Sequence, residues 1–91
     1  MHLNKQQRLQ LKAQSHHLKV IVIIGNQGLT PMVLKEINNA LDAHELVKVR
    51  INTETREERE EIVNQITEAL TATMITSIGH VVTFYRQHEE K

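Results

Sequence analysis

A β-branched run followed by two glycines and a helix start constrains the fold of this chain most strongly. The run Val20–Ile24 contains only valine and isoleucine, which predicts a strand buried on both faces, as in a parallel sheet. The next residues are Gly25-Asn26-Gln27-Gly28. Thr30-Pro31 then supplies a capping hydroxyl and a proline at the first helical position. This strand, loop and helix predict an α/β fold.

Three helices are predicted from caps and apolar spacing. The first spans Asn4 to about Gln14, where Asn4 and Gln7 form a capping box, and its thin apolar stripe places it at the edge of the core. The second runs from Thr30 to near His44. The third begins at a capping box over 55–58, with acidic residues in the first turn. Its expected buried stripe consists of Ile62, Val63, Ile66, Ala69 and Leu70.

Three further strands follow from alternation and turn signals. Residues Glu45–Asn52 alternate, which predicts a strand with one partly solvated face and with Val47, Val49 and Ile51 on the other. Met74–Ile78 and Val81–Arg86 predict a hairpin closed by Gly79-His80. The order α-β-α-β-α-β-β predicts a single domain over residues 1–91: a four-stranded mixed sheet with two crossover helices and an additional N-terminal helix.

The formal net charge is zero, but it is unevenly distributed along the chain. Residues 1–50 hold seven basic and three acidic side chains, a net charge of +4, whereas residues 51–91 hold four and eight, a net charge of −4. Such asymmetry is a hint of interaction with nucleic acid or membrane. No apolar run approaches the roughly 20 residues of a membrane span, and no signal-peptide core is present. We therefore expect a soluble, cytoplasmic protein.

The loop Gly25–Gly28 is the strongest candidate site. Its glycines let the backbone turn sharply and let a ligand approach without meeting a Cβ. The helix start behind it offers free N–H groups and positive potential, which favours a phosphate or sugar-phosphate backbone. KH domains clamp single-stranded nucleic acid with a GXXG loop of this kind. Glycine-bearing turns are also common as purely structural connections, and this alternative stays open.

Basic residues in the same half of the chain form a candidate phosphate-contacting face. Lys48 and Arg50 share one face of a predicted strand, and Lys19 immediately precedes the Val20–Ile24 strand. Lys12 lies on the first helix, with Lys5 and Arg8 as weaker candidates. We expect the acidic block 54–61 to face away from a bound polyanion.

Three segments resemble one known family. They are His17–Thr30 (HLKVIVIIGNQGLT), Glu45–Arg50 (ELVKVR) and Ile78–Arg86 (IGHVVTFYR). In this order they resemble the CRM domain, named for chloroplast RNA splicing and ribosome maturation, and the resemblance runs from about Leu3 to Arg86. It implies a fold similar to the C-terminal domain of translation initiation factor three, with Gly25–Gly28 as an RNA-contacting loop. Bacterial stand-alone members of the family are associated with precursors of the large ribosomal subunit.

Other function classes find little support in the sequence. There is no cysteine, and the six histidines lack the spacing of a zinc-binding helix. No serine lies in a nucleophile-elbow context. We therefore expect no enzyme activity, metal, cofactor or small-molecule substrate. Of the two aromatic residues, Phe84 and Tyr85, one should lie in the core, and the sequence does not decide which.

The sequence thus predicts a monomeric RNA-binding protein that binds ribosomal RNA in precursors of the large subunit and assists ribosome assembly. The alternative is a protein–protein adaptor that uses the acidic helix 55–70. The residues predicted to contact RNA are Gly25, Asn26, Gln27, Gly28, Lys12, Lys19, Lys48 and Arg50.

Overall fold

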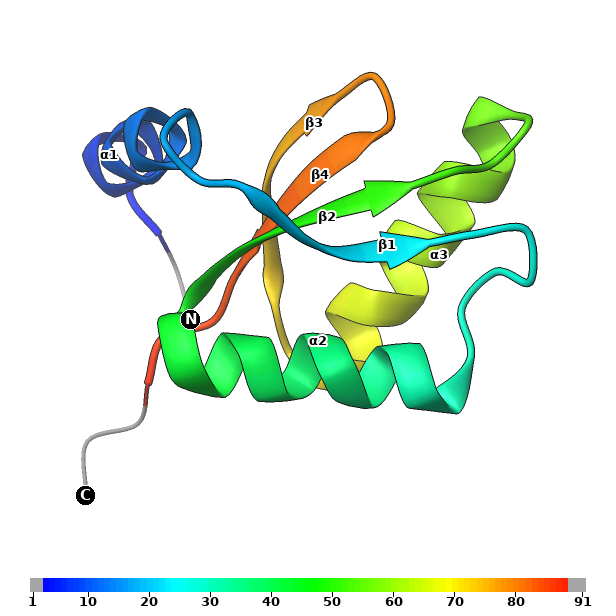
Figure 1. Cartoon of the computed structure of the whole chain (residues 1–91). Helices are drawn as coiled ribbons and strands as arrows, with labels where there is room; N and C mark the ends of the chain where they lie inside the picture. Colours follow the sequence, from blue (N-terminus) through cyan, green and yellow to red (C-terminus); the bar gives the residue numbers. More distant parts are fainter. Residues whose placement is uncertain (1–2, 89–91) are drawn as a thin grey trace.

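The structure is a computed structural model that describes residues 3–88. Its seven elements follow the predicted order (Figure 1). The helices are α1 (Lys5–Ser15), α2 (Pro31–His44) and α3 (Arg56–Leu70), and the strands are β1 (Val20–Ile24), β2 (Leu46–Ile51), β3 (Thr73–Ile78) and β4 (Val81–Tyr85).

The four strands form one mixed sheet in the order β1-β2-β4-β3. β1 and β2 are parallel, whereas β4 pairs antiparallel with both β2 and β3. The closing hairpin therefore inserts β4 beside β2 and leaves β1 and β3 at the two edges. This confirms the predicted mixed α/β architecture.

The main core lies between the sheet and the helices α2 and α3, on what we call the two-helix face. Its strand residues alternate along β2, where Val47, Val49 and Ile51 are buried, and along β4, where Val82 and Phe84 are buried. The helices contribute Ile37, Leu41, Ile62, Val63 and Ile66. Phe84 is therefore the core aromatic residue, and Tyr85 is only partly buried.

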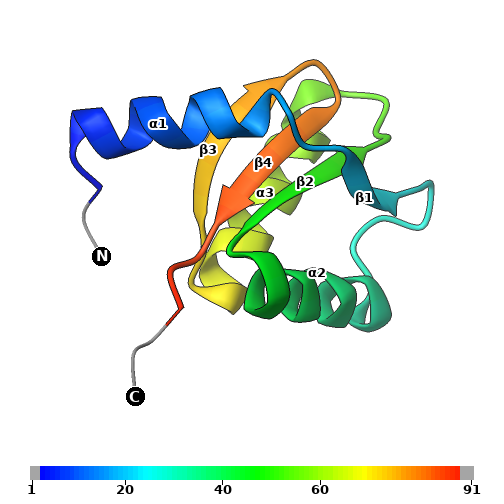
Figure 2. The same ribbon diagram turned by 60° about the vertical axis from the view of Figure 1, so that its left-hand side comes forward.

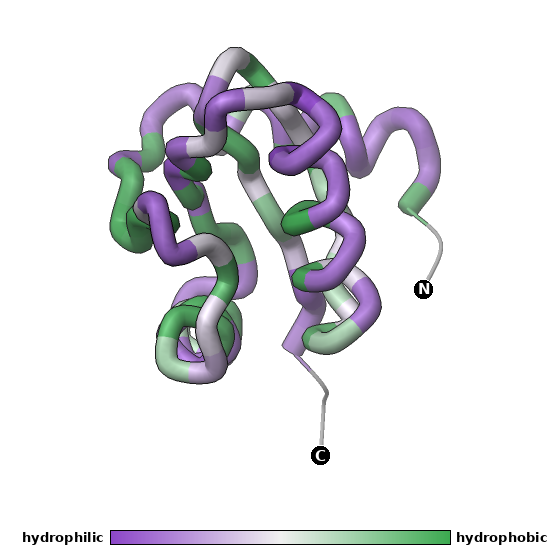
Figure 3. Tube along the Cα trace, turned by 90° about the vertical axis from the view of Figure 1, so that its right-hand side faces the viewer, coloured by the Kyte–Doolittle hydropathy of each residue, from purple (hydrophilic) through white to green (hydrophobic). Residues whose placement is uncertain are grey.

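The opposite side of the sheet, which we call the α1 face, is covered only in part. α1 contacts β2 and β3 and crosses the sheet on the side away from α2 and α3 (Figure 2). Buried residues outside the main core, among them Leu46 and Ile75, show where this second layer packs. α1 is mostly hydrophilic (Figure 3), so it covers a small apolar area, as its thin stripe predicted.

The predicted helix boundaries follow from their caps. Asn4 and Gln7 form the expected capping box, with Asn4 Oδ1 accepting from Gln7 N at 2.8 Å and Gln7 Oε1 accepting from Asn4 N at 2.9 Å. The Thr30 hydroxyl accepts from Val33 N at 3.2 Å. At α3 only half of the expected box forms, because Thr55 accepts from the Glu58 amide without the reciprocal bond.

Two burial predictions are wrong. β1 is buried on one face only, since Ile21 and Ile23 are 52% and 61% exposed while Val22 and Ile24 are in the core. The physical reason is that β1 is an edge strand and α1 lies over β2 and β3 instead. Ala69, predicted in the buried stripe of α3, is exposed, because in the last turn of the helix it is Leu70 that packs against the core.

Within residues 3–88, no helix is both long and apolar enough to cross a bilayer.

Candidate functional site

The glycine loop forms a tight turn at the carboxyl end of β1. The Gly28 amide donates to the Gly25 carbonyl at 3.0 Å, so Asn26 and Gln27 occupy the two central positions and are exposed. Gly28 has a φ of 71°, which favours glycine. A Cβ at Gly25 would meet no heavy atom within 4 Å. The loop is therefore open to solvent, and α2 begins directly behind it.

One side of this loop is acidic. A concavity of about 370 Å³ is lined by Gly25, Asn26 and Gly28 and, on its other wall, by Glu54, Glu58 and Glu61. The Asn52 amide, just after β2, donates to the Ile24 carbonyl at the end of β1 at 2.9 Å. This hydrogen bond holds the segment after β2 next to the glycine loop. Three glutamates of the acidic block 54–61, which is predicted to face away from a bound polyanion, therefore lie beside the candidate loop. A polyanion can approach the loop favourably only from the side of the sheet away from them.

The predicted basic residues lie along β1 and do not form one cluster. Lys19 precedes the five residues of β1 and Gly25 follows them, so the strand separates the two by about 20 Å at ~3.3 Å per residue. Lys12 lies in the last turn of α1, at the same end as Lys19. Arg50 pairs with Ile23, close to the loop. The structure brings Arg50 near the loop and leaves Lys12 and Lys19 at the other end of the strand.

Lys48 connects α1 to the sheet. Its Nζ donates to the Ser15 carbonyl at 2.8 Å and to the Leu18 carbonyl at 3.4 Å, at and just beyond the end of α1. An ammonium there satisfies carbonyl groups that the helix end leaves free. Lys48 is partly buried, whereas the Arg50 side chain is exposed and its Nε donates to Asn52 Oδ1 at 3.0 Å. Of the two, only Arg50 is fully accessible to a ligand.

The sheet separates the charges of the molecule. Within residues 3–88, every acidic residue lies in α2, in α3 or in the loops that join these helices to β2, and none lies on α1, on its linker to β1 or on the α1 face of the sheet. The α1 side carries the basic residues Lys5, Arg8, Lys12, Lys19, Lys48 and Arg50. The acidic residues are therefore confined to one side of the sheet, whereas basic residues lie on both sides and are the only charged lysine, arginine, aspartate or glutamate side chains on the α1 side.

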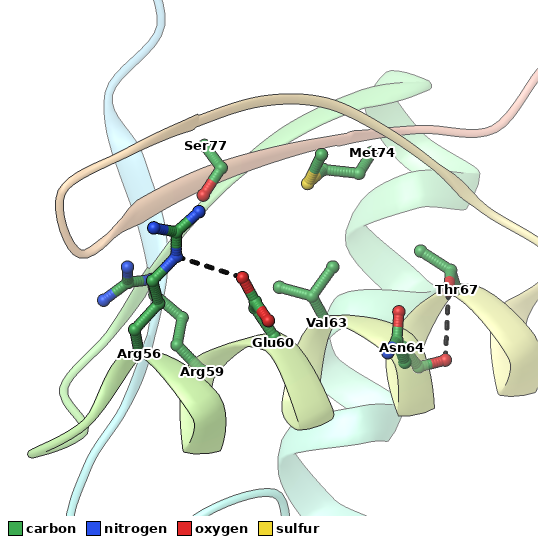
Figure 4. A pocket seen from close by; sticks show the side chains of 8 residues that line it. All are labelled: Arg56, Arg59, Glu60, Val63, Asn64, Thr67, Met74 and Ser77. Atoms are coloured by element: carbon green, nitrogen blue, oxygen red, sulfur yellow. Dashed lines mark hydrogen bonds and ion pairs between the residues drawn. The ribbon is translucent and has the colours of Figure 1, made fainter.

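A second groove, of about 510 Å³, lies between α3 and β3 on the two-helix face (Figure 4). Val63 and Met74 provide apolar surface, and Arg56 and Arg59 project toward the end where Ser77 lies. Arg56 Nε donates to Glu60 Oε1 at 3.1 Å, so its charge is partly balanced within the groove. This groove combines a small apolar surface with polar side chains and charges of both signs, unlike the α1 side.

Arg86 has a structural role that the sequence did not reveal. Its guanidinium donates to Asn38 Oδ1 at 2.8 Å, to the carbonyls of Leu70 and Asn38 at 3.0 and 3.1 Å, and to Asp42 Oδ1 at 2.6 Å. One side chain after β4 thus joins α2 to the end of α3. Its separation in sequence from these partners, 16 to 48 residues, hides this role from local patterns.

Among the described residues, no group of three or more histidine, aspartate or glutamate side chains is placed to hold a metal ion. Neither of the two concavities described above is lined by a histidine or a cysteine side chain.

These features define a class of small α/β domain in which a GXXG loop follows the edge strand of a mixed sheet and one side of the sheet is basic. The sequence profile of the CRS1 / YhbY (CRM) domain matches residues 3–86, and the chain belongs to this family.

Relatives of known name agree with this assignment. The chain is 42% identical over 88 residues to a protein of Haemophilus influenzae named "RNA-binding protein", covering 97% of this chain and 89% of that one. It is 34% identical to "Probable RNA-binding protein PA4753" of Pseudomonas aeruginosa, covering 97% and 85%. The solution structure of the hypothetical protein SAV1595 from Staphylococcus aureus has the same fold, with a TM-score of 0.83 and 26% identity over 98% of this chain and 93% of that one. The names of the first two relatives denote binding proteins and not enzymes.

Proposed function

We propose that this protein binds RNA with its α1 side and its glycine loop, and that its target is ribosomal RNA in precursors of the large ribosomal subunit. In this proposal it acts in the cytoplasm as a monomer and assists assembly without catalysing a reaction. The observation that carries the proposal is the segregation of charge: in the described chain the α1 side has six lysine and arginine residues and no acidic residue. Polyanion binding depends on such a surface.

The proposed mechanism is contact with the RNA backbone. The open turn at Gly25–Gly28 lets a phosphate approach the start of α2, where N–H groups and the helix dipole favour negative charge. Because Glu54, Glu58 and Glu61 line the other side of the loop, the RNA reaches the loop across the α1 face. There Lys12, Lys19 and Arg50 contact phosphates along β1, and Lys48 adds charge while holding α1 in place. Only Asn26 and Gln27 offer loop side chains for base readout, so we expect slight sequence specificity.

A variant of the loop tests this mechanism. Gly25→Asp should keep the fold, because a Cβ there meets no atom within 4 Å, and should weaken ribosomal RNA binding about tenfold by placing a carboxylate in the phosphate path. Asn64→Asp is the control for the added negative charge, because Asn64 is exposed on α3, on the side of the sheet away from the proposed RNA surface. Equal affinities of Gly25→Asp and the wild type, measured by filter binding, would remove the loop from the mechanism.

The cellular target is tested separately, by sedimentation of cell extracts through sucrose gradients. The protein should migrate with precursors of the large subunit, and ribonuclease should abolish this migration. Migration with mature particles only, or with no ribosomal particle, would contradict the proposed target.

The groove between α3 and β3 supports a second candidate function, that of a protein–protein adaptor using the acidic helix 55–70. Met74, 38% exposed, and Val63 give this groove an apolar surface that a protein partner could cover. In the same gradients, a complex that persists after ribonuclease treatment and is absent in Met74→Asp would favour the adaptor.

A further inference from the structure

An exposed row of aliphatic side chains crosses the α1 face beside the region that α1 covers. Ile23 pairs with Arg50, Arg50 pairs with Val81, and Val81 pairs with Ile78, so the four residues form one row across all four strands. Paired residues in neighbouring strands place their side chains on the same face. Ile23 and Ile78 are 61% and 65% exposed, and Ile21, 52% exposed, extends the row along β1. We call these five residues the aliphatic platform.

The platform is unusual for a surface of this small domain. Isoleucine and valine stabilise a strand mainly when a second layer covers them, and here α1 covers only the neighbouring part of the face, over β2 and β3, where Leu46 and Ile75 are buried. Exposed apolar side chains grouped on one face, here Ile21, Ile23 and Ile78, are typical of a binding site. The platform spans the sheet, roughly 14 Å at ~4.8 Å between strands.

Its charge environment indicates the occupant. Arg50 lies inside the platform, Lys19 and Lys48 lie next to it, and no acidic side chain is found on this face within residues 3–88. A protein partner would also bury apolar surface, but only a partner with both apolar surfaces and regular negative charge matches the whole face. Unpaired nucleotides of RNA have this combination, since each base has two flat, apolar faces and is linked through its ribose to a phosphate. Duplex RNA offers the phosphates but keeps its base faces stacked inside.

We infer that the aliphatic platform binds the faces of unpaired bases in single-stranded segments of RNA, while Arg50 and Lys19 contact their phosphates. The inference rests on the proposed RNA-binding function and deepens it, because it names unpaired nucleotides as the substrate class and the sheet face as their site. A four-stranded sheet of this size accommodates two or three bases in RNA-recognition motifs, where aromatic rings supply the stacking surface. Here isoleucine side chains supply apolar area without stacking, so the gain per base is smaller than on an aromatic ring.

The test compares single-stranded and duplex RNA of equal phosphate number. Ile23→Thr with Ile78→Thr keeps β-branched residues in both strands and removes apolar area. The double variant should bind single-stranded RNA about tenfold more weakly than the wild type, with an unchanged salt dependence and unchanged affinity for the duplex. Met74→Thr is the matched control, because Met74 is exposed on β3 but faces the groove on the other side. Thermal unfolding of each variant verifies the fold.

Each other outcome is decisive. Unchanged affinity for single-stranded RNA, with a wild type that binds it, would overturn the platform and leave the proposed function intact. An equal loss of affinity for duplex and single strand would show that the residues do not contact bases. If the double variant keeps its RNA affinity but loses a protein complex or a self-association that the wild type shows, the platform would be assigned to a protein partner. If the wild type binds neither RNA, the proposed function itself fails.

Discussion

The two sides of the sheet differ in packing and in charge. The two-helix face is covered by α2 and α3, contains the continuous core and carries all the acidic residues of the described chain. The α1 face is covered by one hydrophilic helix over part of its area, leaves the aliphatic platform exposed and carries only basic charge within residues 3–88. The first side supplies stability, and the second combines the charge and exposed surface that a polyanionic ligand requires.

This difference changes the meaning of the zero net charge. A neutral chain has no long-range attraction for RNA if its charges are mixed, but segregated charges of opposite sign create a local positive field on one side. The acidic layer then faces away from a ligand bound to the α1 face, apart from the glutamates beside the loop. Binding should occur on one side only and should weaken steeply with salt.

The largest expected effect is on the two-helix face. Arg86→Met should lower the free energy of unfolding by about 3 kcal/mol, because it removes the charged hydrogen bonds that join α2 to α3 and leaves the Leu70 and Asn38 carbonyls without this donor. The measurement is urea unfolding followed by circular dichroism. RNA affinity of the folded variant should be unchanged. A decrease in RNA affinity at full stability would show that Arg86 belongs to the binding surface.

Charge reversal on each side of the sheet tests whether RNA affinity depends on the position of the basic residues or only on the net charge of the protein. The triple variant Lys12→Glu, Lys19→Glu and Arg50→Glu should bind RNA on the order of 30-fold more weakly, and its salt slope should fall by about 0.7 for each phosphate that the variant no longer neutralises. The control has the same net charge, with the basic residues of the two-helix side reversed instead: Lys35→Glu, Arg56→Glu and Arg59→Glu. If both triple variants bind equally weakly, the protein senses only net charge and the segregation of charge does not direct binding.

The smallest effect concerns Tyr85, where the two sides meet at the end of β4. Burial, and secondarily the nearby Glu45 carboxylate, raise the pKa of the Tyr85 phenol above its ordinary value of 10.0. The folded state therefore holds this proton more tightly than the unfolded chain does. This contribution to stability is present below pH 10 and is lost as the pH rises through the folded-state pKa. When the pH is raised from 8 to 11, the urea concentration at the midpoint of unfolding should fall less for Tyr85→Phe than for the wild type. An equal fall in both proteins would contradict a raised pKa of the Tyr85 phenol.

Local signals were sufficient to predict the order of elements and the sheet. Each helix start carries a cap that the structure uses, and the alternation of β2 matches its buried face. Strand, helix and hairpin signals of this kind act within a few residues, so they can be read from one sequence.

Features that depend on distant partners were not predictable. The run Val20–Ile24 is equally apolar on both faces, and only the position of α1 over β2 and β3 decides that one face stays exposed. The sequence alone indicates that Lys48 is a solvated surface charge. Its hydrogen bonds to the carbonyls of Ser15 and Leu18, 33 and 30 residues away, become visible only in the structure. The glutamates that follow β2 come to lie beside the loop that follows β1, and their separation in sequence from the loop hides this contact from local patterns.

Mapping the bound surface by NMR tests most directly whether RNA binds the α1 side. Amide resonances of the ¹⁵N-labelled protein are followed while a short single-stranded RNA is added. We expect the shifted resonances to belong to α1, to β1 and to the loop Gly25–Gly28, together with Arg50 and Ile78 on the sheet. Resonances of the α3 groove, such as those of Glu60 and Asn64, should stay unchanged. Shifts concentrated in α3 and along its groove with β3, with α1 and the loop unaffected, would contradict binding by the α1 side.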